Sequence, residues 1–441
     1  MEYLVGLDIG TSSVKGVLMS RDGKVATVKT KKHNYYWEDK FKLLNAEDFC
    51  ENCFSVIKEI SDTLSEGDNI AAVCVSGAGG NLMLVKDGKS CSPVYGWQTF
   101  YDDEITNKTL SKMTKPVYDV VGWPSKLKTF PLAALAYLKG TNPEAIENAD
   151  TVCMHIEYLS YKLTGAWGIT RSMGTTFFLI DQEKGEYYQE YLDMLGLRKE
   201  QLLPILPNCS IQGRVNAYAA EKTGLKEGTP VIPGTFDHPS AARGAGVMDE
   251  NNVMVSCGTS WVVFIPYATR QIPFSKGMLI DPFMAPEGNW CGMKSMPSVS
   301  ETIDKYMTTF LGDISVKEFD KLAAESSLGC NGLVIEDENT DVSGYSRPDI
   351  ARAIMENIAR RLKEFFEVLD VKTDTVKLVG GITNSKPWCD VVAEITGKKV
   401  LVVNGEHAGA IGSAIMAGVG VGFYPNEKDA FNSMGFTARE S

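Results

Sequence analysis

The stretch that decides the fold is Leu4-Val-Gly-Leu-Asp-Ile-Gly-Thr-Ser-Ser-Val-Lys-Gly-Val-Leu-Met19. Two apolar runs, each too short for a helix, flank Gly10-Thr11-Ser12, which predicts a buried strand, a turn and a second strand. Glycine lets the backbone approach a ligand closely, and the amides and hydroxyls that follow can donate to phosphate oxygens. The turn alone is compatible with a phosphate site or with a plain hairpin.

Two charged residues accompany this turn. Lys15 can add a positive charge for a phosphate group, and Asp8, two residues before Gly10, stands where a carboxylate can hold Mg²⁺ through water. The alternative for Asp8 is a buried carboxylate that accepts hydrogen bonds from the turn amides.

The same pattern returns in the second half of the chain. Apolar residues 252–257 precede Gly258-Thr259-Ser260, and apolar residues 261–265 follow it. The identical strand, turn and strand setting favours an internal duplication over chance. It predicts a domain boundary near Gly246.

Short apolar runs and longer amphipathic segments alternate along the rest of the chain. Such alternation predicts α/β architecture with ligands at strand ends. The expected strands are 70–75, 231–233, 376–379 and 399–403, and the expected helices are 46–64, 131–161, 350–369, 387–396 and 406–418.

Asp237 is the candidate catalytic group in the middle of the chain. It follows the expected strand 231–233 and Gly234-Thr235, and it precedes His238 and Pro239. A carboxylate at a strand end can accept a proton from an attacking hydroxyl. Asp before a nearby Pro is also a common helix start, and taken alone the capping role is favoured.

Composition restricts the function classes. The 441 residues carry a net charge of −12 and have 44% hydrophobic residues, which indicates a globular chain without a nucleic acid or anionic membrane partner. Four His and scattered Cys argue against zinc. Residues 408–423 are too short and glycine-rich for a membrane span and predict a buried helix. Glu2 stands where a signal peptide would be basic, so we expect a cytoplasmic protein.

The order of these motifs resembles that of the FGGY carbohydrate kinases, the relatives of glycerol kinase and xylulokinase. The resemblance is carried by residues 4–18, 230–247, 252–264 and 377–422, with weaker support from 73–77 and 155–165. It implies an α/β fold of two ribonuclease-H-like (actin/hexokinase-type) domains with a central cleft. Residues 1–246 would form a sugar-binding and catalytic-base domain, and residues 247–441 a nucleotide-binding domain.

The resemblance also implies roles for individual residues. Asp237 would be the base that takes the proton from a sugar hydroxyl, and Asp8 would organise Mg²⁺. The residues implied to bind ATP are Gly10, Thr11, Ser12, Lys15, Gly258, Thr259, Gly380, Gly381 and Asn384. The residues implied to bind the substrate are Gly79, Gly80, Asn81, Trp97, Asp237 and His238.

The sugar-binding motifs depart from the family pattern. Ala78-Gly79-Gly80 replaces the family's Gln-Met-His, and Trp97-Gln-Thr-Phe-Tyr101 keeps the Trp of Trp-x-Asp-x-Arg without its charged residues. Missing hydrogen-bonding groups remove the contacts that discriminate among polyols. The aromatic residues Trp97, Phe100 and Tyr101 are candidates either for the sugar pocket or for the core. The chain is also short for the family, with the shortfall in the second domain.

The resulting prediction is an ATP- and Mg²⁺-dependent kinase that phosphorylates a hydroxyl of a small sugar, polyol or sugar acid, as a xylulokinase does. The alternative is an actin-like ATP-binding protein that has lost sugar phosphorylation, and a weaker one is an ATPase that uses water as acceptor. The expected partners are ATP and a small-molecule substrate, with no nucleic acid and no membrane. Whether the protein forms a homodimer is not decided by the sequence.

Overall fold

The computed structural model describes residues 1–124 and 128–441. Two compact units are present: a first unit of Met1–Gly244, Ala268–Cys291 and Gly409–Gly435, and a second unit of Ala245–Tyr267, Gly292–Ala408 and Phe436–Ser441. The first change of unit, after Gly244, lies close to the expected boundary near Gly246. The chain then returns twice to the first unit, so the division differs from a single cut into residues 1–246 and 247–441.

A six-stranded sheet forms the centre of the first unit, in the order β15-β16-β6-β1-β2-β3. The strand bounds are β1 Glu2–Ile9, β2 Ser13–Ser20, β3 Val25–Lys32, β6 Asn69–Gly77, β15 Gly213–Arg214 and β16 Pro230–Phe236. Strands β1, β6 and β16 are parallel neighbours, and β2 and β3 continue the sheet antiparallel to β1. The carboxyl ends of β1, β6 and β16 therefore meet at one edge of the sheet.

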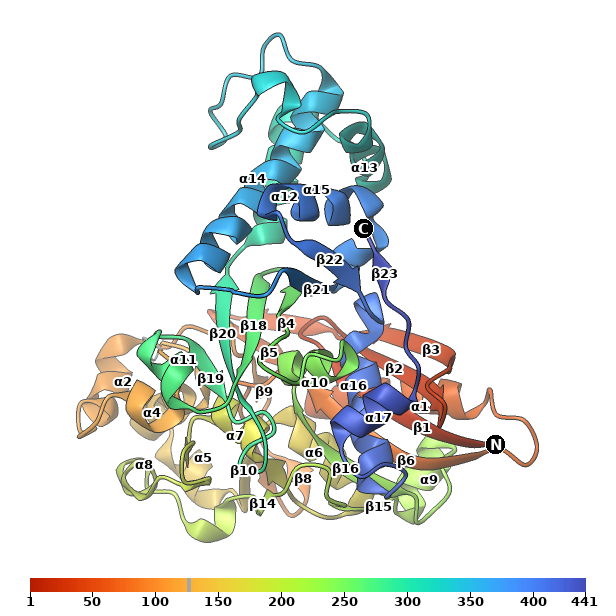
Figure 1. The fold of residues 1–441 in the computed structure, drawn as a ribbon. Coiled ribbons are helices and arrows are strands. Elements are labelled where there is room, and N and C mark those ends of the chain that lie inside the picture. The colour runs from red at the N-terminus through yellow and green to blue at the C-terminus, as the bar shows by residue number, and fades with distance from the viewer. Residues whose placement is uncertain (125–127) are drawn as a thin grey trace. The chain divides into compact units, whose positions relative to one another are not determined.

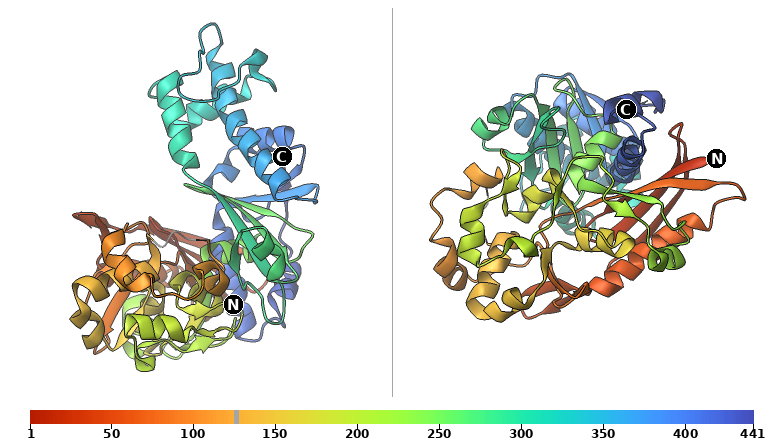
Figure 2. Two further views of the ribbon diagram at one scale, coloured as in Figure 1. Left: turned by 90° about the vertical axis from the view of Figure 1, so that its left-hand side faces the viewer. Right: turned by 90° about the horizontal axis from the view of Figure 1, so that it is seen from below.

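Helices cover both faces of this sheet, as Figure 2 shows in its right-hand view. A Cβ at Gly16 on β2 would meet Val56 and Ile60 of α1 (Ala46–Ser61), whereas a Cβ at Gly6 on β1 would meet α16 (Ala408–Gly420). Gly6 lies opposite Val17 in the β1–β2 register, so Gly6 and Gly16 point to opposite faces. The predicted buried helix of residues 408–423 is confirmed as α16, on the face opposite α1 (Figure 1).

Smaller elements complete the first unit. The segment 131–161, expected to be helical throughout, is interrupted by a three-residue strand that pairs with β7, so this prediction was wrong in its middle. Two three-stranded sheets have the orders β4-β5-β9 and β10-β7-β8. The bounds are β4 Tyr35–Glu38, β5 Phe41–Leu44, β7 Met83–Lys86, β8 Lys89–Ser90, β9 Val94–Tyr95, β10 Thr151–Cys153, α2 Asp103–Leu110, α4 Phe130–Thr141, α5 Pro143–Asn148, α6 His155–Thr164, α7 Arg171–Phe177, α8 Gln189–Leu195, α9 Ala217–Thr223, α10 Asp237–Gly244 and α17 Glu427–Ser433.

The second unit has its own mixed sheet, in which strands follow the order β20-β18-β17-β21-β22-β23. Trp388 on α15 packs edge-on against Trp261 on β18, and Phe319 on α13 contacts the same Trp388 ring. These contacts place α13 and α15 on one face of the sheet. The bounds are β17 Met254–Cys257, β18 Trp261–Tyr267, β20 Trp290–Met296, β21 Thr375–Val379, β22 Lys399–Val402, β23 Arg439–Glu440, α12 Val299–Leu311, α13 Val316–Ala324, α14 Arg347–Val368 and α15 Lys386–Thr396.

The lengths of the helices bear on the question of a membrane span. Within the described part of the chain, none is both long and apolar enough to cross a membrane.

Candidate active site

Asp237 is the first residue of α10 and follows directly on β16, a strand whose residues 231–235 are buried. Its carboxylate accepts a hydrogen bond from the backbone N–H of His238 at 2.7 Å, and 29% of the side chain is exposed. The His238 ring packs edge-on against Phe236, with ring centroids 5.3 Å apart. From the sequence, Asp237 could be either a catalytic base or a helix cap. The carboxylate accepts a hydrogen bond at the helix start and stays partly exposed, so its role as a base stays a prediction.

Asp8 lies at the end of β1, directly opposite Lys15 on β2. Burial and then the repulsion of Asp237 raise the pKa of Asp8 to about 7, against the opposing effect of Lys15. Two carboxylates from the ends of β1 and β16 therefore influence each other, and a divalent cation would stabilise the charged form of both.

These residues fit the chemistry of Mg²⁺. In the ranges 1–124 and 128–441, no group of three or more His, Cys, Asp or Glu side chains could hold a metal ion by itself. Mg²⁺ is commonly held by only one or two carboxylates, together with water and substrate phosphates. Asp8 is the residue that would hold the ion, with Asp237 close enough to feel its charge.

Three glycines bring β1, α10 and α16 into close contact. A Cβ at Gly6 would lie 1.9 Å from the carbonyl oxygen of Ala410, and a Cβ at Gly412 would lie 1.8 Å from that of Ser240. A Cβ at Gly409 would lie 2.2 Å from Asp8 Oδ2. The three elements approach so closely only because these positions have no side chain. Asp8 at the end of β1 and Asp237 at the start of α10 are thereby close enough to interact electrostatically.

Two serines fasten these elements with hydrogen bonds. Ser413 Oγ on α16 donates to the carbonyl oxygen of Leu7 on β1 at 2.8 Å. Ser240 Oγ on α10 donates to the carbonyl oxygen of Gly409 at 2.8 Å and lies 3.1 Å from Ser413 Oγ. Both serines are fully buried, so each bond satisfies a polar group that would otherwise be costly.

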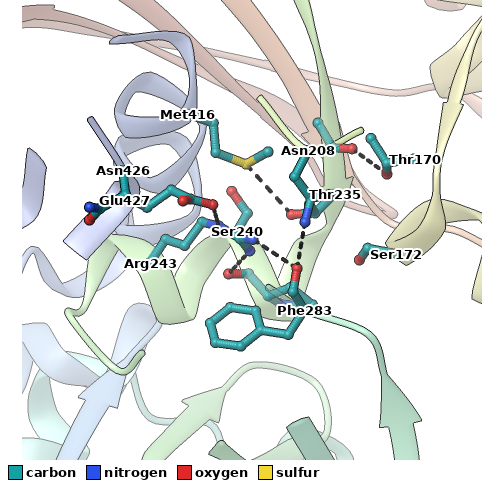
Figure 3. Close-up of polar contacts among 12 residues, drawn as sticks. Thr170, Ser172, Asn208, Thr235, Ser240, Arg243, Phe283, Met416, Asn426 and Glu427 are labelled. Carbon is teal, nitrogen blue, oxygen red and sulfur yellow. Dashed lines mark hydrogen bonds and ion pairs between the residues drawn. The ribbon is translucent and has the colours of Figure 1, made fainter. Parts of the chain in front are cut away.

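A buried arginine holds the far end of α10 (Figure 3). Arg243 is fully buried, and its Nε lies 3.3 Å from Glu427 Oε1 at the start of α17. Its other nitrogens donate to the carbonyl oxygens of Pro239 and Phe283 at 3.1 and 3.0 Å, and the guanidinium lies over the Phe283 ring. Asn208 also donates to the Phe283 carbonyl. The helix that begins with Asp237 is therefore anchored over its length.

The strand before Asp237 is also held by side chains. Thr170 Oγ1 donates to the carbonyl oxygen of Gly234 at 2.8 Å, and the N–H of Phe236 donates to Ser172 Oγ at 3.2 Å. Ser172 in turn donates to the buried Asp281 carboxylate at 2.8 Å. Burial raises the pKa of Asp281 to about 6. No sequence motif marked Ser172 or Asp281, because the two residues are far apart in the chain.

The predicted turn of Gly10-Thr11-Ser12 is present between β1 and β2, and its role in binding phosphate stays a prediction. The N–H of Gly10 donates to the carbonyl oxygen of Ser13 at 2.9 Å, and Ser12 accepts from the N–H of His33 at 2.9 Å. Thr11 Oγ1 accepts from the indole N–H of Trp97 at 3.1 Å. Lys15 is the third residue of β2, shortly after the turn in the sequence. The first unit thus contains this turn, with Asp8 just before it and Trp97 hydrogen-bonded to it.

The predicted substrate residues have different surroundings. Cβ atoms at Gly79 and Gly80 would meet Thr176 and the Phe130 ring, and Gly80 has a positive φ of 82°. Asn81 is 1% exposed, and both ends of its amide have protein partners, so a direct substrate contact by Asn81 stays a prediction.

An aromatic cluster that the sequence did not reveal lies beside Phe236. Trp123 packs edge-on against Phe236, Phe130 and Phe178, and Phe130 stacks on Phe178 at 4.7 Å.

The expected aromatic group of Trp97, Phe100 and Tyr101 is divided. Tyr101 is 5% exposed and packs with Phe41 and Tyr137, whereas Phe100 is 64% exposed. Tyr101 is therefore a core residue rather than part of a pocket.

The second unit gathers its predicted nucleotide residues around two turns. Cys257 pairs with Trp261, so Gly258-Thr259-Ser260 is a three-residue connection, one residue shorter than the connection between Ile9 and Val14. Ser300 at the start of α12 donates its N–H to the carbonyl oxygen of Thr259 at 3.1 Å. The two turns are related in setting but differ in length.

The turn at Gly380-Gly381, which follows β21, packs against the end of β17 just before Gly258-Thr259-Ser260. Gly380 has a φ of 101°, and a Cβ there would lie 2.5 Å from the carbonyl oxygen of Cys257. Asn384 Nδ2 donates to Glu406 Oε1 at 2.9 Å. Gly258, Gly380, Gly381 and Asn384 therefore belong to one continuous region of the second unit.

Comparison with known protein families identifies both halves of the chain. The description "FGGY family of carbohydrate kinases, N-terminal domain" matches residues 3–244, and the corresponding C-terminal domain matches residues 335–421.

Curated relatives and solved structures agree with this assignment. The chain is 24% identical to the xylulose kinase of Bacillus subtilis (strain 168), covering 96% of this chain and 89% of the relative. It is 26% identical to the L-xylulose/3-keto-L-gulonate kinase of Escherichia coli (strain K12), covering 97% and 90%. The ligand-bound xylulose kinase from Lactobacillus acidophilus has the same fold, with a TM-score of 0.86, 19% identity and coverage of 100% and 93%.

Proposed function

Since the chain belongs to the FGGY family of carbohydrate kinases, which phosphorylate sugar hydroxyls with ATP and Mg²⁺, we propose that Asp237 is the general base of this reaction. The carboxylate would take the proton from the acceptor hydroxyl while that oxygen attacks the γ-phosphorus of ATP. The bond between the γ-phosphorus and the β–γ bridging oxygen then breaks, and ADP leaves with the electron pair.

The observation that carries this proposal is the electrostatic repulsion between Asp237 and Asp8. The two carboxylates come from the ends of different strands and interact electrostatically, and Asp8 bears the raised pKa. Perturbed carboxylates of this kind are concentrated at functional sites. Asp237 keeps an exposed face while its backbone is fixed by α10, which is what a positioned base requires.

Residues of both units are proposed to bind the nucleotide. Asp8 would hold Mg²⁺, which neutralises charge on the phosphates when bound. The proposed phosphate-binding residues are Gly10, Thr11, Ser12, Lys15, Gly258 and Thr259, and the proposed nucleoside-binding residues are Gly380, Gly381 and Asn384. Phosphoryl transfer depends mainly on such positioning and charge stabilisation, so amides, hydroxyls and one Lys are suitable groups.

The acceptor is proposed to be a small sugar, polyol or sugar acid similar to the substrates named for the relatives, such as xylulose or 3-keto-L-gulonate. Trp97, Gly79, Gly80, Asn81 and His238 are the proposed residues on the acceptor side. We also propose that the enzyme acts in the cytoplasm, without nucleic acid or membrane as partner.

The test is a coupled ADP-release assay on purified protein over a panel of ketoses, polyols and aldonates. Asp237→Asn removes the basic oxygen without changing the shape of the side chain. We expect turnover to fall by about 10³-fold or more, within the range that a positioned base contributes together with its site. Binding of a non-hydrolysable ATP analogue should change by less than about threefold, because the base acts on the acceptor.

Asp193→Asn is the matched control, because Asp193 is an exposed carboxylate on α8 that accepts a hydrogen bond from Gln189. It should keep full activity. Undiminished turnover of the Asp237→Asn protein would remove the base assignment. ATP hydrolysis that no compound of the panel stimulates would instead support the ATPase that uses water as acceptor, and ATP binding without sugar-stimulated turnover would support the actin-like alternative.

A further inference from the structure

The indole of Trp97 is joined to the phosphate turn by a hydrogen bond. Its Nε1–H donates to Thr11 Oγ1 at 3.1 Å, across 86 positions of sequence. The resemblance assigns Trp97 to the acceptor and Thr11 to the nucleotide. The bond connects a residue of each group inside the first unit, where both residues lie.

The backbone of Trp97 is itself held by a buried pair of side chains. The backbone N–H of Trp97 donates to Asn81 Oδ1 at 2.8 Å, and Asn81 Nδ2 lies 3.1 Å from Nδ1 of His155. Asn81 and His155 are both 1% exposed, so this pair is shielded from competing water.

The chain on either side of Trp97 is also tied to a strand. The N–H of Gly96 donates to the carbonyl oxygen of Lys42 on β5 at 2.9 Å. Thr99 Oγ1 accepts from the N–H of Lys42 at 3.2 Å, and Thr99 is fully buried. These three hydrogen bonds fix the chain segment that carries Trp97, and the bond to Thr11 then orients the indole.

The chemistry of a hydroxyl gives this contact a consequence. A threonine hydroxyl has one proton to donate and two lone pairs to accept with. In the bond to Trp97 the oxygen accepts, so its own proton is left to be donated to another oxygen. A donor held in one orientation loses less entropy when it binds an anion.

We propose that Trp97 is a positioning residue for the nucleotide, in which its indole N–H orients the Thr11 hydroxyl to donate to a phosphate oxygen. This inference rests on the proposed function, because it takes Thr11 as part of the phosphate site. It assigns Trp97 a role toward ATP in addition to its proposed place on the acceptor side.

The test is a double-mutant cycle with Trp97→Phe and Thr11→Val, read by calorimetric titration with a non-hydrolysable ATP analogue and Mg²⁺. Trp97→Phe keeps a smaller aromatic ring and deletes the N–H. In the otherwise native chain it should weaken binding about three- to tenfold, since one hydrogen bond contributes about that factor. In the Thr11→Val background the same change should weaken binding less than twofold, because the partner is already gone.

Two further variants separate positioning from general damage. Thr11→Ser retains the hydroxyl and should restore the effect of Trp97→Phe, whereas Trp37→Phe alters a tryptophan that is 64% exposed on β4 and should leave affinity unchanged. Equal effects of Trp97→Phe with and without the Thr11 hydroxyl, or no effect in the native background, would overturn the proposal.

The cycle is independent of the base assignment. Nucleotide binding is measured without an acceptor and without turnover, so it does not depend on Asp237. If Asp237→Asn retains activity but the cycle shows coupling, only the base assignment fails. If the cycle shows no coupling while Asp237→Asn is inactive, only the positioning role of Trp97 fails.

Discussion

The carboxylate of Asp8 lies against the backbone of Gly409, so closely that a Cβ at position 409 would be 2.2 Å from Asp8 Oδ2. Non-bonded carbon and oxygen atoms cannot approach to that distance, so the site depends on a glycine 401 positions away in the sequence. Gly409 therefore helps to position Asp8, the residue proposed to hold Mg²⁺, although it offers no chemical group of its own.

Gly409→Ala should damage activity more than stability. The new methyl group has to push Asp8 out of place, and a displacement of about 1 Å at a catalytic group can cost about 100-fold in rate. We expect kcat to fall at least about tenfold and the Mg²⁺ requirement to rise, with an unfolding cost of about 1–3 kcal/mol from overpacking. Coupled assays at varied Mg²⁺ and urea unfolding measure the two effects.

Gly418→Ala is the matched control on the same helix. A Cβ there would meet the side chains of Tyr424 at 2.8 Å and Leu4 at 2.9 Å, away from Asp8. It should lower stability by a comparable amount and leave the Mg²⁺ requirement unchanged. An equal loss of Mg²⁺ response in both variants would show that Gly409 acts only through stability.

Asp8 should also make the stability depend on pH. Its pKa is raised from 3.8 in the ordinary state to about 7 in the folded chain, so the folded chain holds this proton more tightly than the unfolded chain. The resulting stabilisation is fully present below about pH 4 and is lost as the pH rises to about 7. Relative to Asp8→Asn, the native chain should therefore lose unfolding free energy between pH 4 and 7.

Urea unfolding at several pH values without Mg²⁺ measures this difference. Saturating Mg²⁺ favours the ionised carboxylate, so it should reduce the dependence on pH and release a proton on binding near pH 6. Parallel stability curves for the native chain and Asp8→Asn would contradict the raised pKa.

Glu427→Ala should destabilise the first unit strongly. Arg243 is fully buried, and removal of its carboxylate partner leaves a charge that water cannot reach. Breaking a buried pair in this way typically costs about 3 kcal/mol or more. Urea unfolding of the purified variant measures the change, and activity per folded molecule should fall little, because the Arg243 bonds to Pro239 and Phe283 remain.

Lys386→Ala is the corresponding control, since it breaks an exposed ion pair with Asp390 on α15. Surface pairs contribute little, so the cost should stay within about 0.5 kcal/mol. Similar costs for the two variants would mean that Arg243 finds compensation elsewhere when Glu427 is removed.

Local sequence pattern was sufficient for the elements that carry the site. The strand, turn and strand around Gly10 and the helix after Glu406 were predicted close to their observed bounds, because apolar periodicity and glycine position are local signals. Strand β10 was missed, because three residues give too short a pattern and its partner β7 is more than 60 positions away.

Contacts between distant residues could not be predicted in the same way. Nothing near Asp8 indicates Gly409, and nothing near Trp97 indicates Thr11, because both pairs form only when the sheet and its helices are assembled. Tyr101 illustrates the same limit: its type fitted either a pocket or the core, and only the packing with Phe41 and Tyr137 places it in the core.

The dependence of Asp8 on α16 has a consequence for biosynthesis. Asp8 and Asp237 are both translated before the helix that covers β1 at Gly6 and supports Asp8, because that helix begins only at residue 408. A nascent polypeptide stopped before that point carries both carboxylates but exposes the apolar face of β1. The two carboxylates are thus supported only after α16 has been translated, and we expect a nascent polypeptide that stops before α16 to bind chaperones through its exposed apolar surface rather than to consume ATP.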